Sequence, residues 1–173
     1  MAIGRRGLLL GGAGLAALGW LRPGNEGGAY DPYFAGLNRE LQAQGVSHPR
    51  LLLDLDRVDA NINEVMRHMT GPKQWRIVVK SLPSIDLLRH AMARSGSNAL
   101  MAFHQPFINI IAREFPEADV LLGKPLPVAA LASFYRELPA GGFDPQRQLQ
   151  WLVDSDQRLA EYQQLAQAIG TRM

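Results

Sequence analysis

Cysteine is absent from the 173 residues of this chain, and that absence excludes several kinds of chemistry. Without cysteine the chain can form no disulfide, no thiolate nucleophile and no cysteine-ligated metal centre. The four histidines do not follow a spacing that is typical of zinc ligands. The sequence also lacks a GxxxxGK[ST] phosphate-binding loop and a GxGxxG dinucleotide fingerprint. We therefore predict no metal site in this sequence and no nucleotide-binding fold of these two kinds.

A strong net charge is also missing. Lysine and arginine together number 18 against 16 acidic residues, which leaves a net charge of +2 at pH 7. This surplus is too small to indicate a nucleic-acid partner. Hydrophobic residues make up 47% of the chain and charged residues 20%, which is the balance of a globular protein. A chain of this length can form one ordinary domain with a hydrophobic core.

The longest hydrophobic stretch is short and lies near the N-terminus. Arg5 and Arg6 precede an apolar, glycine-rich segment over residues 7–21. This segment has about fifteen residues, whereas a membrane-spanning helix needs about twenty. A charged start followed by a short apolar stretch is typical of an export signal, and the paired arginines resemble a twin-arginine signal. We predict that residues 1–24 direct export to the periplasm; the alternative is an uncleaved anchor in the inner membrane.

The rest of the chain divides into a connector and a folded part. Residues 25–50 are rich in glycine and polar residues, with one short helix predicted over residues 33–41, where Phe34, Leu37 and Leu41 share a face. From residue 51 onward, short apolar runs alternate with amphipathic segments. This alternation predicts a parallel α/β sheet.

Five strands and five helices are expected after the connector. The predicted strands cover residues 51–56, 75–80, 98–103, 119–124 and 149–154. The predicted helices cover residues 57–69, 85–94, 107–115, 127–138 and 156–169, with Ser84 and Ser155 as N-caps of the second and the last. We predict that residues 51–173 form part of a TIM-type (β/α) barrel. Because a closed barrel needs eight strands, we expect the barrel to be incomplete and the chain to be the front part of a longer protein.

Lys80 is the most informative residue of the folded part. It ends the predicted strand 75–80, and in barrel folds the residues at such strand ends form the active site. Apolar neighbours along its stem are expected to lower its pKa, and an uncharged lysine amine can form a Schiff base with an aldehyde such as that of pyridoxal phosphate. The alternative is a lysine whose stem merely extends toward solvent.

Two stretches around Lys80 resemble the alanine racemase-like, fold type III pyridoxal phosphate enzymes. The run over residues 49–56, followed by Asn61 and Ile62, is similar to the opening of these enzymes, and Lys80 falls at the place of their cofactor lysine. Within the family the chain is most similar to the D-threonine aldolase and D-serine dehydratase branch, which carries an arginine where this chain has Arg76. The resemblance implies an internal aldimine on Lys80 and a cofactor-binding role for Arg76.

The resemblance also implies a lyase or isomerase that acts on a small D-amino or β-hydroxy amino acid. The bond that is broken stays open: C–H in a racemase, Cα–Cβ in an aldolase or Cβ–O in a dehydratase. Ser84 stands where the racemases carry a tyrosine, so the second base of a two-base racemase is not at that position. The resemblance implies a homodimer, and a metal ion only in a later domain of the branch. The alternatives are a pyridoxal phosphate-binding protein without turnover and an inactive remnant.

Other candidates lie near the same strand ends. His104 follows the predicted strand 98–103 and could bind near the cofactor ring or relay a proton; the alternative is a polar residue at a helix start. Lys124 ends the predicted strand 119–124 and is the rival of Lys80 for the cofactor. Asp54 and Asp56 are interpreted as structural residues near a helix start.

Overall fold

The computed structural model describes residues 27–81 and 84–172. The chain divides into two compact units, Met1–Leu51 and Leu52–Met173. The predicted export signal over residues 1–24 lies outside the described residues. None of the helices in the described part of the chain is long and apolar enough to cross a membrane.

The described part of the first unit contains one helix, α2 (Pro32–Ala43). Asp31 is its N-cap, because the Asp31 side chain accepts a hydrogen bond of 2.9 Å from the Tyr33 amide. Proline at the first helical position supports the same start, since it has no amide hydrogen to leave unpaired. The helix predicted over residues 33–41 is therefore confirmed.

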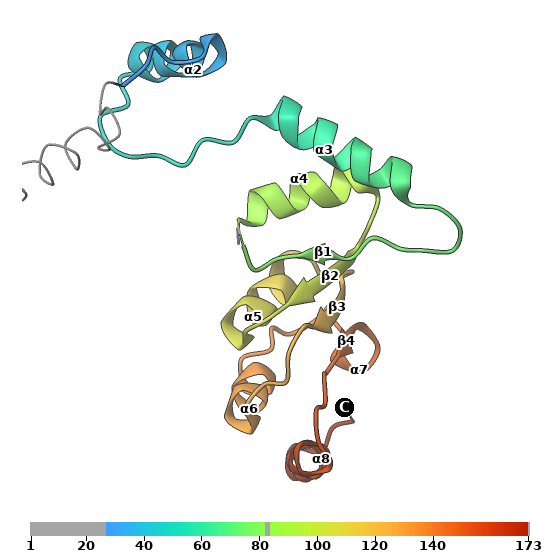
Figure 1. Ribbon diagram of the computed structural model, residues 1–173. Helices are drawn as coiled ribbons and strands as arrows, with labels where there is room; N and C mark the ends of the chain where they lie inside the picture. The colour runs from blue at the N-terminus through green and yellow to red at the C-terminus, as the bar shows by residue number, and fades with distance from the viewer. Residues whose placement is uncertain (1–26, 82–83, 173) are drawn as a thin grey trace, which may run out of the picture. The chain divides into compact units, whose positions relative to one another are not determined.

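The second unit is built on a four-stranded parallel sheet in which sequence neighbours are sheet neighbours (Figure 1). Its strands, in sheet order, are β1 (Ile77–Val78), β2 (Ala99–Ala102), β3 (Asp119–Leu122) and β4 (Leu149–Gln150). Its helices are α3 (Leu55–His68), α4 (Ile85–Ser95), α5 (Gln105–Glu114), α6 (Val128–Arg136), α7 (Pro145–Gln148) and α8 (Asp156–Ile169). The predicted α/β class is confirmed. The described strands form an open sheet, and a closed barrel is not present among them.

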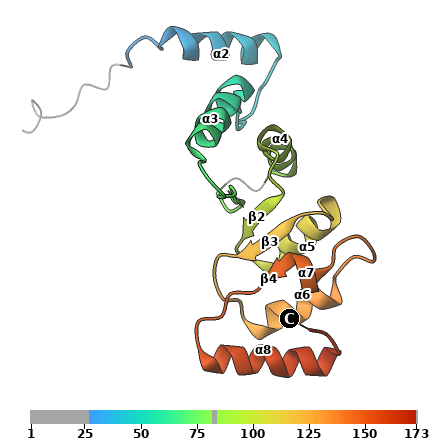
Figure 2. The ribbon, with the colours of Figure 1, turned by 90° about the vertical axis from the view of Figure 1, so that its right-hand side faces the viewer.

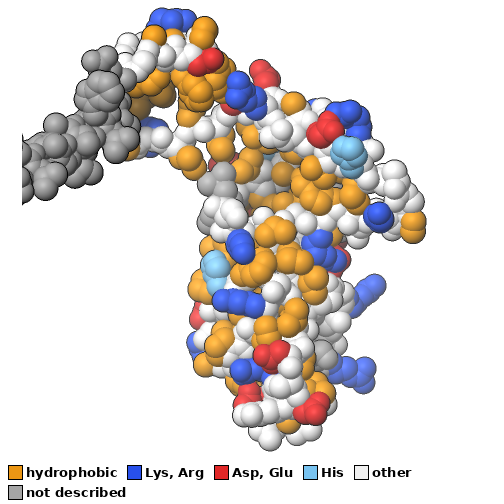
Figure 3. Space-filling model, viewed as in Figure 1, with side chains coloured by type: hydrophobic (Ala, Val, Ile, Leu, Met, Phe, Trp, Pro, Cys, Tyr) orange, Lys and Arg blue, Asp and Glu red, His pale blue; other side chains and the backbone are white. Residues whose placement is uncertain are grey.

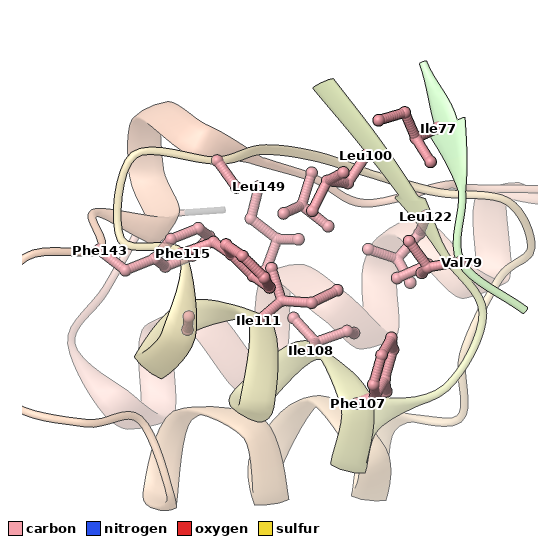
Figure 4. Close-up of a cluster of buried hydrophobic side chains, with 14 of the residues drawn as sticks. Ile77, Val79, Leu100, Phe107, Ile108, Ile111, Phe115, Leu122, Phe143 and Leu149 are labelled. Carbon is pink, nitrogen blue, oxygen red and sulfur yellow. The ribbon is translucent and has the colours of Figure 1, made fainter. Parts of the chain in front are cut away.

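One face of the sheet carries the hydrophobic core. Leu100 and Val120 are register partners on this face, and both are completely buried. Helix α5 packs against it, and Figure 4 shows Ile108 and Ile111 pointing toward the strand side chains. Each fully buried side chain of this size contributes about 1.5–3 kcal/mol of transfer free energy.

Helices α4 and α6 contribute to the same core. Leu88 of α4 and Leu131 and Phe134 of α6 belong to the cluster that contains Leu100 and Ile108. Helices α4, α5 and α6 therefore cover one face of the sheet (Figure 2). The opposite face remains available for other contacts.

The helix boundaries follow local capping signals. The Ser84 hydroxyl accepts a hydrogen bond from the Leu87 amide, and the Ser155 hydroxyl accepts one from the Arg158 amide. Helix α4 ends at Gly96, which has a φ of 69° that glycine adopts without strain. Both predicted N-caps are confirmed. Along α8, Tyr162 is buried, whereas Leu159 and Ile169 are 43% and 42% exposed.

The strand predicted over residues 51–56 is wrong. Residues 51–54 have no regular structure, and Leu51 is 74% exposed. Helix α3 begins at Leu55 because an Asp54 carboxylate oxygen accepts a hydrogen bond from the Arg57 amide. A strand needs a pairing partner, whereas this cap needs only neighbouring residues. The other four predicted strands exist but are shorter than predicted.

Candidate functional site

The face of the sheet opposite the core is open. Strand side chains alternate between the two faces, so Val78, Met101 and Leu121, which are register neighbours, share this second face. Val78 is 50% exposed, and Met101 and Leu121 are half-buried. Figure 3 shows hydrophobic side chains at the surface over the sheet, with lysine and arginine side chains among them.

Three residues follow β1, β2 and β3 at the carboxyl ends of these strands: Lys80, Phe103 and Gly123. Pairing continues beyond the assigned strands, because the Val79 amide donates to the Met101 carbonyl and the Gly123 amide donates to the Ala102 carbonyl. The three residues therefore lie side by side at one edge of the open face. We call Lys80, Phe103 and Gly123 the carboxyl-edge group.

Lys80 lies over the aromatic ring of Phe103. Its Nζ atom is 5.0 Å from the centre of the ring, which is within the range of a cation–π contact. Lys80 is exposed, and Phe103 is half-buried. The stem was expected to lie among apolar neighbours; in the structure its amine is accessible and has an aromatic neighbour.

Gly123 leaves free the space that the Phe103 ring occupies. A β-carbon built on Gly123 would overlap the Cε1 and Cζ atoms of that ring. A residue with a side chain at position 123 would therefore displace Phe103. The glycine is explained by close approach of an aromatic ring to the backbone.

A second group on the open face joins Arg76, which precedes β1, Asp119, the first residue of β3, and Gln150 of β4. Arg76 donates to the Asp119 carboxylate at 2.6 Å and to the carbonyls of Asp119 and Leu100 at 2.9 and 3.0 Å. Gln150 donates to the other carboxylate oxygen of Asp119 at 2.6 Å. We call these three side chains the polar bridge, because they connect β1, β3 and β4 across the open face.

The polar bridge lowers the pKa of Asp119. Burial of the carboxyl group raises this pKa, but the hydrogen bonds from Gln150 and Arg76 and the positive charge of Arg76 outweigh that effect. Arg76 precedes β1 and Lys80 follows it, so the structure places these two predicted cofactor residues at opposite ends of the strand. The guanidinium of Arg76 is engaged with the sheet itself.

The remaining predicted residues hold helix starts or stay exposed. His104 is the N-cap of α5, with its Nδ1 atom accepting a hydrogen bond of 3.4 Å from the Phe107 amide. Asp54 caps α3 and Asp56 lies in the first turn of that helix. Both positions agree with the interpretation of these residues as structural. Lys124 is exposed and follows Gly123, so it remains the rival of Lys80.

Four residues of these two groups were not predicted from the sequence: Phe103, Gly123, Asp119 and Gln150. An isolated glycine at the end of an apolar strand is a signal of close backbone approach and could have indicated Gly123. The partners of Arg76 carry no local signal, since Asp119 is 43 residues away in the sequence.

An apolar hollow of about 330 Å³ lies beside β1 and α4, and Val78 lines it as well. Most residues that line that hollow are hydrophobic, and Ser81 and Ser84 are the polar residues of its lining. Lys80 does not line it. Within residues 27–81 and 84–172, no cluster of three or more histidine or acidic side chains could hold a metal ion.

Comparison of the chain with protein-family models, with curated proteins and with solved structures finds no match.

Proposed function

We propose that this chain binds pyridoxal phosphate covalently through Lys80 and belongs to a lyase or isomerase that acts on a small D-amino or β-hydroxy amino acid. The observation that carries the proposal is an exposed lysine amine at the carboxyl edge of a parallel sheet, on its open face. The resemblance of the sequence around Lys80 to the alanine racemase-like enzymes supports the same residue.

We also propose that the sheet is a segment of a TIM-type (β/α) barrel. Two features support this: the strands follow each other in sequence order, and α4, α5 and α6 cover a single face. Doubly wound sheets instead carry helices on both faces. In a barrel the uncovered face is the interior, and the carboxyl ends of the strands bind the substrate. Lys80 lies at that end.

The residues present fit pyridoxal phosphate in part. Lys80 offers an accessible amine for the cofactor aldehyde, and Phe103 offers an aromatic surface next to that amine. Arg76 is occupied by the polar bridge, so its role in this proposal is to hold the strand that ends in Lys80. His104 uses Nδ1 for its cap, which leaves Nε2 as the atom for a cofactor or a proton.

When bound, pyridoxal phosphate supplies an electron sink for breaking a bond at the substrate α-carbon or β-carbon. The chain contributes a base next to that carbon, since the Nζ atom of Lys80 can accept a proton and return it. The polar bridge fixes β1 relative to β3 and β4, and thereby fixes the origin of the Lys80 side chain.

We further propose export directed by residues 1–24, and a homodimer as in the enzymes that the sequence resembles.

Borohydride trapping tests the Lys80 assignment. The chain has three lysines, Lys73, Lys80 and Lys124, so every candidate can be followed in one peptide map. The full chain is mixed with pyridoxal phosphate, reduced and digested, and the modified lysine is located by mass spectrometry. We expect the modification on Lys80 in the wild type and in Lys124→Ala, and its loss from that position in Lys80→Ala.

Modification of Lys124 with Lys80 unmodified would refute the assignment. Equal modification of all three lysines would refute it as well, because an ordinary exposed amine would then explain the reaction. Circular dichroism of each variant confirms that the proteins compared are folded.

A further inference from the structure

The carboxyl-edge group contains more than a reactive amine. We propose that the Phe103 ring is the stacking surface of this site and makes it selective for flat aromatic aldehydes over aliphatic ones. This inference rests on the proposed covalent role of Lys80 and deepens it by naming the ligand class and the residue that selects it.

The position of the amine is the first step. Lys80 Nζ lies 5.0 Å from the centre of the Phe103 ring. In an aromatic aldehyde the reactive carbon is attached directly to the ring, so a bond from Nζ to that carbon brings the two rings close together. Aromatic pairs are favourable at centroid distances of about 4.5–7 Å. An aliphatic aldehyde of similar charge has no ring to place there.

The second observation is the position of the Phe103 ring over Gly123. Because Gly123 has no side chain, the ring can cover the backbone at the end of β3. The ring occupies the space that a side chain at position 123 would fill, and this places it next to the amine of Lys80.

The partial burial of Phe103 is the third step. Buried phenylalanines such as Phe107 and Phe134 lie on the core side of the unit, whereas Phe103 is half-buried on the opposite face. A phenylalanine that served packing alone would be expected on the core face with the others. At the carboxyl ends of the strands, the Phe103 ring instead contacts Lys80, which is the one lysine among residues 76–80.

Formation of the Schiff base needs only the amine of Lys80 and the aldehyde. The nitrogen of Lys80 bonds to the aldehyde carbon, and the aldehyde oxygen leaves as water with two protons from the amine. Borohydride then supplies a hydride to that carbon, and a solvent proton completes the secondary amine on Lys80. The trapped product records which aldehyde reached Lys80.

Two phosphorylated aldehydes test the inference, one aromatic and one aliphatic: pyridoxal phosphate and glyceraldehyde 3-phosphate. The measured quantity is the ratio of their trapping rates at Lys80, with Lys73 in the same sample as internal reference. We expect Phe103→Leu to lower this ratio about two- to tenfold relative to the wild type, the range of an aromatic pair. Phe103→Tyr keeps the ring and is expected to keep the ratio.

A measurement without aldehyde tests the contact itself. With ¹³C-methylated lysines, the three lysine signals can be resolved by NMR, and the ring current of Phe103 should shift only that of Lys80. We expect this shift in the wild type and in Phe103→Tyr, and its loss in Phe103→Leu. A wild-type Lys80 signal at the position of Lys73 would overturn the inference even if Phe103→Leu does not fold.

The outcomes separate the two proposals. Trapping at Lys80 with an equal ratio in wild type and Phe103→Leu overturns the role of Phe103 and leaves the Lys80 assignment intact. Absence of trapping at Lys80 in the wild type overturns the Lys80 assignment and this inference together. A ratio that falls in Phe103→Leu and is retained in Phe103→Tyr supports both.

Discussion

Asp119 connects the chemistry of a single carboxylate to the stability of the sheet. Its folded-state pKa is lowered, so folding favours the ionised form. The carboxyl group of an unfolded aspartate has a pKa of about 3.9. The stabilisation from ionised Asp119 is therefore complete above that value and is lost as the pH falls through the lower folded pKa.

We predict that Asp119→Asn lowers the free energy of unfolding at pH 7 by about 1–3 kcal/mol, because Arg76 loses its charged partner. The difference between variant and wild type should shrink on acidification below pH 4, as the wild-type carboxylate becomes protonated. Urea unfolding at pH 7 and near pH 3 measures both effects. A difference that stays the same at the two pH values would contradict the lowered pKa.

His104 allows a structural role to be separated from a chemical one. As N-cap of α5, its ring nitrogen accepts from the Phe107 amide. We predict that His104→Ala lowers the free energy of unfolding by about 1 kcal/mol and that His104→Ser restores most of it, since serine is a good N-cap. Thermal or urea unfolding measures the effect.

The same two variants test the chemical role. If His104 also binds the cofactor, His104→Ser should weaken pyridoxal phosphate binding although its stability is restored. If the serine variant matches the wild type in both stability and binding, capping alone explains His104.

At the scale of elements, α5 is the helix on which the core depends most. Ile108 is completely buried against the sheet, whereas Ile110, on the same helix, is only partly buried. We predict that Ile108→Ala costs about 2–5 kcal/mol of unfolding free energy and Ile108→Val about 0.5–1.5 kcal/mol. Ile110→Ala is the matched control and should cost clearly less than Ile108→Ala. Equal costs for the two alanine variants would mean that α5 does not pack as described.

The helices were predictable from sequence because their signals are local. Ser84 and Ser155 hydrogen-bond to amides three residues away, and the predicted α4 and α8 follow from these caps. The strand predicted over residues 51–56 was wrong because pairing depends on distant residues, while Asp54 acts on the next turn of chain. Strand existence was predictable for the four runs that lie buried between helices, but strand length was not.

The candidate site divides in the same way into features that depend on local sequence and contacts that depend on distant residues. The place of Lys80 after a strand is a local property, and the structure has it there. Its contact with Phe103 requires the register between β1 and β2, and the contact of Arg76 with Asp119 requires the order of three strands. These contacts join residues 23 and 43 positions apart in the sequence, for which one sequence offers no periodicity.

At the scale of the whole sheet, two strands form its edges, β1 and β4. A free edge of a parallel sheet presents unpaired backbone groups that can pair with another chain. β1 also carries Val78, which is 50% exposed on the open face. We therefore predict that the protein self-associates through β1.

We predict that Val78→Lys shifts the protein toward the monomer, because a charge next to the edge opposes pairing with a second copy. Val65→Lys is the matched control, since Val65 is 38% exposed but lies on helix α3. Sedimentation velocity over a series of protein concentrations measures the association of each protein. An equal shift in both variants would indicate general surface hydrophobicity, whereas a shift confined to Val78→Lys assigns the contact to the free edge of β1 and the open face beside Lys80.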